Sequence, residues 1–140
     1  MRRARLAVPL VLALLAGCGG SDEPPPVVVT CGSTASSGPL AVTPPAGYTC
    51  GTATWPTNNV YTFTAAANAQ HTVTLATTAG DADLWVWVQG GSLVGSSINV
   101  PPLVDAVTFM AASGTTYEVE VEDASFTSSS STYGVMVTSP

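Results

Sequence analysis

The stretch AGDADLWVWVQGG, residues 79–91, holds the side chains with the clearest capacity for chemistry. In an extended strand, alternate side chains point to opposite faces of the sheet. One face is then apolar, with Ala82, Leu84, Val86 and Val88. The other face carries Asp81, Asp83, Trp85, Trp87 and Gln89. The first face suits a protein core, and the second face is the predicted ligand-binding face.

The two carboxylates of this face, Asp81 and Asp83, are a candidate calcium site. Calcium takes six to eight oxygen ligands, often from loop carboxylates and carbonyls, but this spacing is not that of an EF-hand. The alternative, which we favour, is that the aspartate oxygens accept backbone N–H bonds and fix the loop. Calcium stays a candidate because Glu118, Glu120 and Glu122 add a same-face acidic row without a basic side chain to relieve it. We predict no other cofactor.

The two rings, Trp85 and Trp87, would lie about 7 Å apart along one strand. An exposed pair of this kind forms an aromatic platform that stacks on sugar rings or grips apolar peptide side chains. The alternative is that residues 31–56 cover the rings, with Trp55 and Tyr48 packing against them. We slightly favour the covered arrangement, because monomers avoid large exposed apolar patches.

The sequence offers little for catalysis. His71 is the one histidine, and the Gly-x-Ser-x-Gly turn that presents a serine nucleophile is missing. Zinc chemistry needs more His or Cys ligands than the chain supplies. Paired carboxylates can hydrolyse glycosides, but only in a cleft that orients the sugar. We therefore predict that the protein is not an enzyme, and that His71 faces solvent at a strand end.

The first residues are typical of an export signal. MRRAR is a basic segment, and LAVPLVLALLAG is an apolar segment too short for a stable membrane span. The segment ends in Leu-Ala-Gly-Cys18, which resembles a bacterial lipobox. This predicts a signal peptide at 1–17, acylation of Cys18 and a durable lipid anchor. Gly19, where an Asp would favour inner-membrane retention, suggests the outer membrane in cells with two membranes; the alternative is ordinary secretion.

Removal of the signal leaves a chain without a basic side chain. The three arginines all lie within residues 1–17, so the formal charge moves from −6 to −9, carried by nine acidic residues. Nucleic-acid binding is excluded, because it relies on Lys and Arg to displace phosphate counterions. Contacts with anionic headgroups would be repulsive, so the lipid must provide the anchoring.

Two cysteines remain once Cys18 is acylated. In an oxidising compartment Cys31 and Cys50 are expected to form a disulfide. Closing a loop of this length contributes about 3 kcal/mol by restricting the unfolded chain. The alternative, a two-cysteine metal site, lacks further Cys or nearby His ligands.

The rest of the chain alternates apolar and polar residues with period two. Residues 18–30 are an acidic, Pro-rich tether, and residues 31–140 form one domain. The fold class predicted is all-β, a two-sheet antiparallel β-sandwich, jelly-roll-like, with eight or nine short strands. The strand-like runs are at 40–43, 48–55, 60–65, 71–77, 79–91, 96–100, 106–111, 116–122 and 132–138.

The order of these runs resembles a known family over about residues 59–138. A Y-x-F strand is followed by T-V-T-L, D-x-D-L-x-V, V-x-F, G-T-x-Y-x-V-x-V and Y-x-V-x-V strands. This series looks like the bacterial pre-peptidase C-terminal domain. The resemblance implies a β-sandwich of the kind found at the end of secreted peptidases and other exoenzymes, associated with secretion, processing or substrate adhesion. We expect the domain to act here without a peptidase before it.

These features predict a non-enzymatic lipoprotein of the cell envelope that acts as a binding or adhesion module for glycan or protein. Its expected partners are the membrane, through the anchor, and one such ligand. The alternative is a structural or accessory lipoprotein that supports a separately encoded secreted hydrolase.

Overall fold

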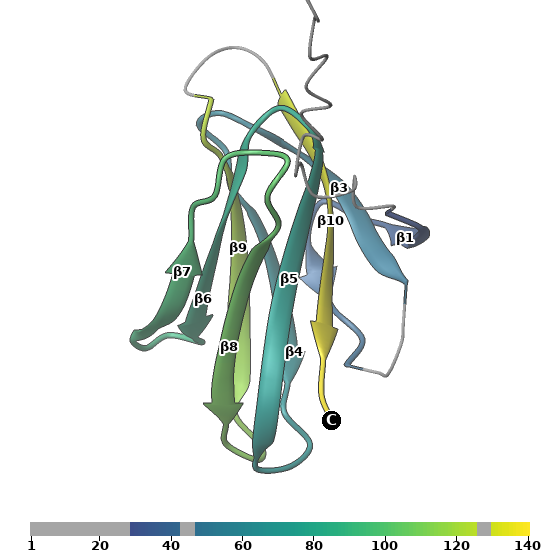
Figure 1. The fold of residues 1–140 in the computed structure, drawn as a ribbon. Helices are drawn as coiled ribbons and strands as arrows, with labels where there is room; N and C mark the ends of the chain where they lie inside the picture. The colour runs from purple at the N-terminus through teal and green to yellow at the C-terminus, as the bar shows by residue number, and fades with distance from the viewer. Residues whose placement is uncertain (1–28, 43–46, 126–129) are drawn as a thin grey trace, which may run out of the picture.

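The computed structural model describes residues 29–42, 47–125 and 130–140. These residues form two five-stranded β-sheets packed face to face (Figure 1), as predicted. In spatial order, the first sheet contains β1 (Cys31–Thr34), β3 (Tyr48–Thr54), β10 (Ser130–Thr138), β5 (Ala69–Ala79) and β8 (Asp105–Ala111). The second sheet contains β2 (Gly38–Pro39), β4 (Asn59–Thr64), β9 (Thr116–Asp123), β6 (Ala82–Val88) and β7 (Leu93–Ser97). We call them sheet A and sheet B.

The predicted signal peptide, Cys18 and the tether up to residue 28 lie outside the described residues. Within the described part of the chain, no helix has the length and apolar character needed to cross a membrane.

The alternation of apolar residues forms the core, as the period-two pattern predicts. Inward side chains from both sheets interdigitate between them, and burial of each large one contributes roughly 1.5–3 kcal/mol. The fully buried residues include Tyr61, Val73, Leu75, Leu84, Val86, Val119, Val121, Tyr133, Val135 and Val137.

The strand count and pairing differ from the prediction at the N-terminal side. β1 and β2 are two additional short strands, and they pair in parallel with β3 and β4. Neither carries the apolar alternation by which strands are recognised. All four residues of β1 are exposed, and β2 is only two residues long. The run expected as a strand at 40–43 makes only a single bridge, from Val42 to Val137.

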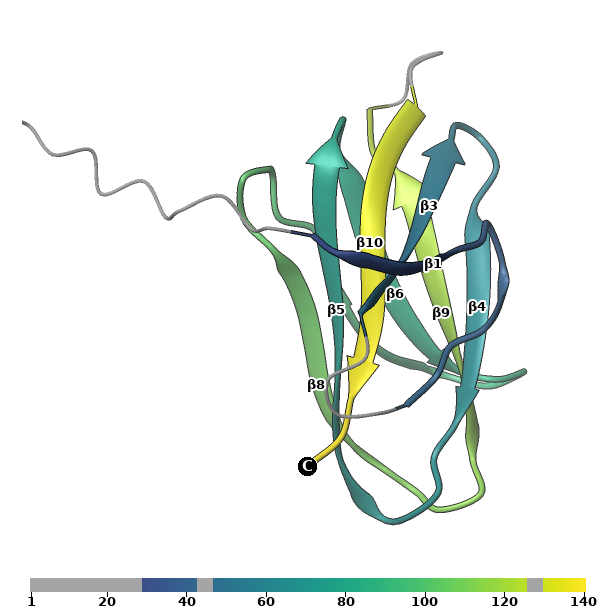
Figure 2. The same cartoon turned by 90° about the vertical axis from the view of Figure 1, so that its right-hand side faces the viewer.

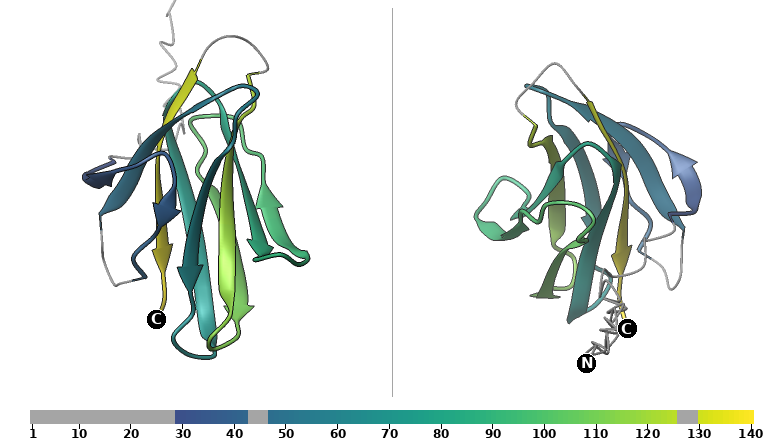
Figure 3. Two further views of the ribbon diagram at one scale, coloured as in Figure 1. Left: turned by 180° about the vertical axis from the view of Figure 1, so that it is seen from behind. Right: turned by 45° about the horizontal axis from the view of Figure 1, so that its top comes forward.

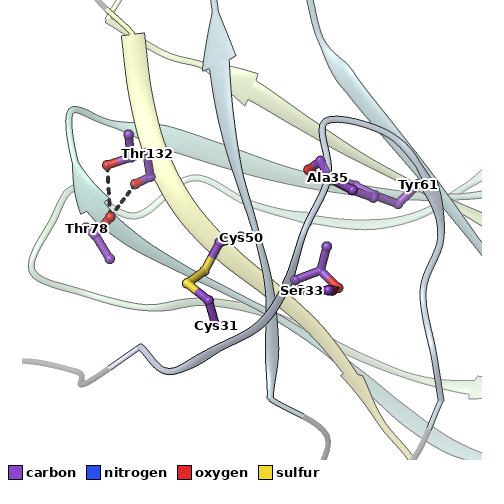
Figure 4. Close-up of a disulfide and its surroundings, with 8 residues drawn as sticks. Cys31, Ser33, Ala35, Cys50, Tyr61, Thr78 and Thr132 are labelled. Atoms are coloured by element: carbon purple, nitrogen blue, oxygen red, sulfur yellow. Dashed lines mark hydrogen bonds between the residues drawn. A yellow bond between two sulfur atoms is a disulfide. The ribbon is translucent and has the colours of Figure 1, made fainter.

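The predicted disulfide between Cys31 and Cys50 is confirmed, and it ties β1 to β3 with a Cα–Cα distance of 5.6 Å (Figure 4). Beside it lies a buried chain of hydrogen bonds. The Tyr133 hydroxyl donates to the Tyr61 hydroxyl at 2.7 Å, and Tyr61 donates to the Ala35 carbonyl at 2.7 Å. These bonds join the segment after β1 to both sheets, so the disulfide corner is part of the folded core.

Candidate functional site

The predicted ligand-binding residues lie on the outer side of sheet B. The left view of Figure 3 shows this sheet from that side, with β9 beside β6. Trp85 is opposite Glu120 of β9, and Trp87 is opposite Glu118. We call this surface the tryptophan face and define it by Asp83, Trp85, Trp87, Glu118, Glu120 and Glu122. All six side chains are partly exposed.

The structure lies between the open and the covered arrangements considered for the tryptophans, because both side chains are only partly exposed and Nε1 of Trp85 is buried. Residues 31–56 mainly extend sheet A, because β3 pairs with β10 and β1 pairs with β3. β2 alone joins sheet B, at the edge beside β4, with β9 between β4 and β6. In the described residues the two sheets are the only strand layers, so the outer side of sheet B has no strand layer over it (Figure 3, left).

A hydrogen-bonded carboxylate positions one of the two rings. The indole Nε1 of Trp87 donates to Oε2 of Glu120 at 3.1 Å. The amide of Asn58 donates to the other oxygen of the same carboxylate. Trp85 differs, because its Nε1 is buried without a hydrogen-bond partner and packing alone holds its ring. The face therefore presents one ring fixed by a charged acceptor and one fixed by its neighbours.

Gln89 lies just beyond the end of β6 and is exposed. Its backbone N–H donates to the Thr116 carbonyl at 3.0 Å, which ties this end of the strand to β9. Its side chain is thus available at one end of the tryptophan face.

The two candidate calcium ligands, Asp81 and Asp83, lie at the other end of the face and are half-buried. Burial raises the pKa of Asp83 to about 6, and repulsion from Asp81, Asp105 and Glu122 adds to the effect. Burial also raises the pKa of Asp81, where Oδ1 is buried without a hydrogen-bond partner. Within the described chain, no group of three or more His, Cys, Asp or Glu side chains is placed to hold a metal ion. Calcium binding stays a prediction.

Another aspartate, Asp123, fixes the loops at this end and was not singled out from the sequence. It is only 1% exposed. Its carboxylate accepts bonds from the Ser131 hydroxyl at 2.7 Å, the Ser125 N–H at 3.2 Å and the Trp55 N–H at 3.4 Å. Burial by itself would raise the pKa of Asp123, but these bonds outweigh burial and hold the pKa below its usual value.

Asp105 is the second buried aspartate, also 1% exposed, at the start of β8. It accepts bonds from the Ser97 hydroxyl at 2.6 Å and the Asn99 N–H at 2.7 Å. The burial of both aspartates could have been predicted from their positions in the alternating strand pattern. Asp123 follows Val119 and Val121 at the same parity, and Asp105 precedes Val107, so both belong to inward-facing rows.

His71 does not face solvent as predicted, because it is 2% exposed in the core. Its ring stacks on Phe63 with centroids 5.8 Å apart and lies near Phe109. Its Nδ1 is 3.1 Å from the Ala69 carbonyl, which can only accept, so that nitrogen carries the proton. A histidine held in this way is a core residue that a substrate does not reach.

A hollow of about 510 Å³ lies beside the disulfide. Cys31, Cys50, Ala35 and Tyr133 line it, with Thr78 and Thr132 at one side (Figure 4). Thr78 donates a hydrogen bond to the Thr132 carbonyl at 3.0 Å. The lining offers hydroxyl groups but no charged side chain and no histidine to activate them, so we assign no chemistry to it.

The arrangement of strands matches known structures. The pre-peptidase C-terminal domain of collagenase from Bacillus anthracis superposes with a TM-score of 0.55 at 13% identity, covering 72% of this chain and 93% of that domain. This chain has the fold of a pre-peptidase C-terminal domain. The predicted resemblance is thereby confirmed for the fold.

Two periplasmic inhibitors of g-type lysozyme are also similar, at lower scores. The PliG proteins of Aeromonas hydrophila and Salmonella Typhimurium are each 13% identical, with TM-scores of 0.49 and 0.47. The matches cover 77% and 74% of this chain and 98% and 99% of the inhibitors. No protein-family profile and no curated protein sequence matches the chain.

Proposed function

We propose that this protein is an exported, non-catalytic binding module, anchored by lipid at Cys18, that recognises a protein ligand through the tryptophan face. The observation that carries the proposal is the combination of two partly exposed tryptophans with four carboxylates on a surface that no strand layer covers. In a cell with two membranes, the expected location is the outer membrane.

The chemistry of the face favours a ligand that carries lysine or arginine. A cation held over an indole ring is stabilised by the ring's electron density. The carboxylates of Glu118, Glu120 and Glu122 line the neighbouring strand and can pair with the same cations. Since the processed chain has no basic residue, its long-range field also attracts a basic partner. A neutral glycan could stack on the rings, but the carboxylate row would add nothing to its binding.

The lipid anchor is supported by the lipobox-like sequence that ends at Cys18. Replacement of Cys18 by serine should abolish incorporation of labelled fatty acid in cells and move the protein from the detergent phase to the aqueous phase. A Cys18→Ser protein that still carries labelled lipid would contradict the anchor and leave the tryptophan face to be tested separately.

The binding proposal is tested with synthetic peptides of matched length that carry either Arg and Trp or Glu and Ser, alongside an array of neutral oligosaccharides. We expect the soluble protein, residues 19–140, to bind the basic peptides, with a Kd at least tenfold weaker in Trp87→Ala and in Glu118→Gln. The matched control is Thr108→Ala, which removes an exposed side chain from sheet A and should leave the Kd within twofold.

Two outcomes would overturn the assignment. The first is binding to oligosaccharides with no preference for basic peptides. The second is basic-peptide binding that survives Trp85→Ala and Trp87→Ala together, while circular dichroism shows that the variant is folded.

A further inference from the structure

The connection between β7 and β8, residues 98–104, carries apolar side chains into solvent. Ile98 is 65% exposed, Val100 is 68% exposed and Leu103 is 52% exposed. The sequence from Leu84 to Val104 contains no charged residue, although the chain as a whole is strongly acidic. An uncharged, exposed apolar loop of this kind marks a contact surface, because monomers seldom leave such groups in water.

Hydrogen bonds hold the loop in one shape. Asp105 accepts from Ser97 and Asn99 at its base, and the Asn99 amide donates to the Val104 carbonyl at 3.1 Å. A turn is closed by the Leu103 N–H, which donates to the Val100 carbonyl at 3.2 Å. The apolar side chains are therefore presented by an ordered loop, which lowers the entropy lost when they make a contact.

The loop lies next to the point where the described chain begins. Residues Pro101 to Val104 face Ala76 and Thr78 of β5 across a hollow of about 410 Å³. Ala76 is paired with Gly134 of β10, and a Cβ on Gly134 would lie 2.6 Å from Cγ1 of Val29. The chain therefore enters the fold beside the loop, on the outer side of sheet A, and Figure 2 shows the two segments close together. Val29 follows Cys18 by eleven positions in the sequence, which limits their distance to about 40 Å.

We propose that Ile98, Val100 and Leu103 insert into the interfacial layer of the membrane that holds the lipid anchor. This proposal rests on the proposed function in one respect: the lipid anchor at Cys18 is what brings the loop towards the membrane. The ability of the loop to bind a membrane does not depend on the anchor. Three side chains form too small a surface for a stable protein interface, which buries about 800 Å² on each partner. They are enough for a weak, reversible membrane contact that adds to a covalent lipid.

The experiment uses unlipidated protein, residues 19–140. Every strand lies between Cys31 and Thr138, so this form keeps the whole sandwich. An environment-sensitive dye is attached to Val100→Cys, and the matched control is Met110→Cys, which is equally exposed at 69% but lies near the other end of β8. With vesicles of zwitterionic phosphatidylcholine, we expect a blue shift of the dye at residue 100 and none at residue 110.

A second pair of variants measures how much the loop contributes. Replacement of Val100 by Asp should lower partition onto these vesicles at least tenfold, since burial of a valine-sized group corresponds to roughly ten- to hundredfold in an equilibrium constant. Replacement of Met110 by Asp should change it less than twofold. Partition onto phosphatidylglycerol vesicles should be weaker, because residues 19–140 contain no lysine or arginine to meet anionic headgroups.

The proposal is overturned if the dye at residue 100 shows no shift, if both positions shift equally, or if anionic lipid strengthens binding. A blue shift that appears without vesicles and grows with protein concentration would instead place a second copy of the chain on the loop, and would also overturn it. Since these measurements use protein without the anchor, they can fail while the Cys18→Ser test succeeds, and the reverse.

Discussion

Two pairs of aspartates near one end of the sandwich experience opposite surroundings. Asp105 and Asp123 are buried, and each accepts at least two hydrogen bonds from nearby serine, asparagine or backbone donors. Asp81 and Asp83 are more exposed, yet burial and neighbouring carboxylates raise the pKa of both. The contrast teaches that donors, rather than depth, decide whether a carboxylate stabilises this fold.

The largest expected effect on stability comes from removing Asp123, the aspartate that accepts the most hydrogen bonds. Replacement of Asp123 by alanine should lower the free energy of unfolding by about 3 kcal/mol, because the Ser131 hydroxyl, the Ser125 N–H and the Trp55 N–H each lose a hydrogen bond to this buried carboxylate. Urea unfolding followed by fluorescence measures the change. The control is Glu118→Gln on the outer side of β9, which lies opposite Thr62 and Trp87 rather than another carboxylate and should change the free energy by less than about 0.5 kcal/mol.

The same pair of variants can break the comparison. If Asp123→Ala and Glu118→Gln are equally stable, the hydrogen bonds to the buried carboxylate contribute nothing beyond those of a partly exposed acid. The pH dependence gives a second test. A pKa held low in the folded state stabilises the protein at neutral pH, and this contribution disappears as the pH falls towards that pKa.

A smaller loss is expected at Asp105, which has two described donors where Asp123 has three. Replacement by alanine should cost about 2 kcal/mol in global stability. It should also speed hydrogen exchange at the Asn99 N–H, because that group loses its acceptor and the β7–β8 loop loses its base. Thr108→Ala, an exposed change further along β8, is the control. Unchanged exchange at Asn99 would show that Asp105 does not organise the loop.

The sequence predicted the layers of this fold better than its edges. Inward rows such as Leu84 and Val86 are unambiguous, because a one-residue shift would expose the whole row to solvent. The short strands β1 and β2 could not be predicted, since their pairing depends on the disulfide and on neighbouring backbone rather than on apolar alternation. A third edge strand, β7, ends at Ser97, three residues earlier than expected, because Asn99 turns its side chain back to the loop.

For the candidate site, the pattern correctly placed Trp85, Trp87 and Asp83 on one side of a strand. It could not tell whether another segment covered that side, because coverage depends on which sheet residues 31–56 join. The buried aspartates were predictable from parity alone, but a charged residue in an inward row is ordinarily taken as the end of a strand. Burial of these two carboxylates depends on hydrogen-bond donors that the strand pattern does not reveal. Asp123 accepts from Ser131, on the next strand, and Asp105 accepts from Asn99, which lies outside any strand.

The smallest predicted effect has the opposite sign and concerns Asp83. This carboxylate lies directly across from Glu122 in the β6–β9 pair, and like charges in that position destabilise a sheet. The folded-state pKa of Asp83, about 6, is above the ordinary value for an aspartate. The contribution of this side chain to folding stability is therefore complete at low pH, where it is protonated, and is lost as the pH rises through 6 and the carboxylate ionises. Asp83→Asn should therefore raise stability by about 1 kcal/mol at pH 7.5, a figure reduced for solvent screening, and by almost nothing near pH 4.

Calcium gives the same residue a second readout. If Asp81 and Asp83 bind the ion, millimolar Ca²⁺ should raise the melting temperature of the natural protein above its value in chelator, and Asp83→Asn should abolish that rise.

Glu118→Gln separates a local effect from a general one, because it removes one negative charge from the tryptophan face but lies opposite Thr62 and Trp87 rather than another carboxylate. If Glu118→Gln stabilises the protein as much as Asp83→Asn at pH 7.5, the gain reflects net charge, and the contrast between the two aspartate pairs would lose its physical basis.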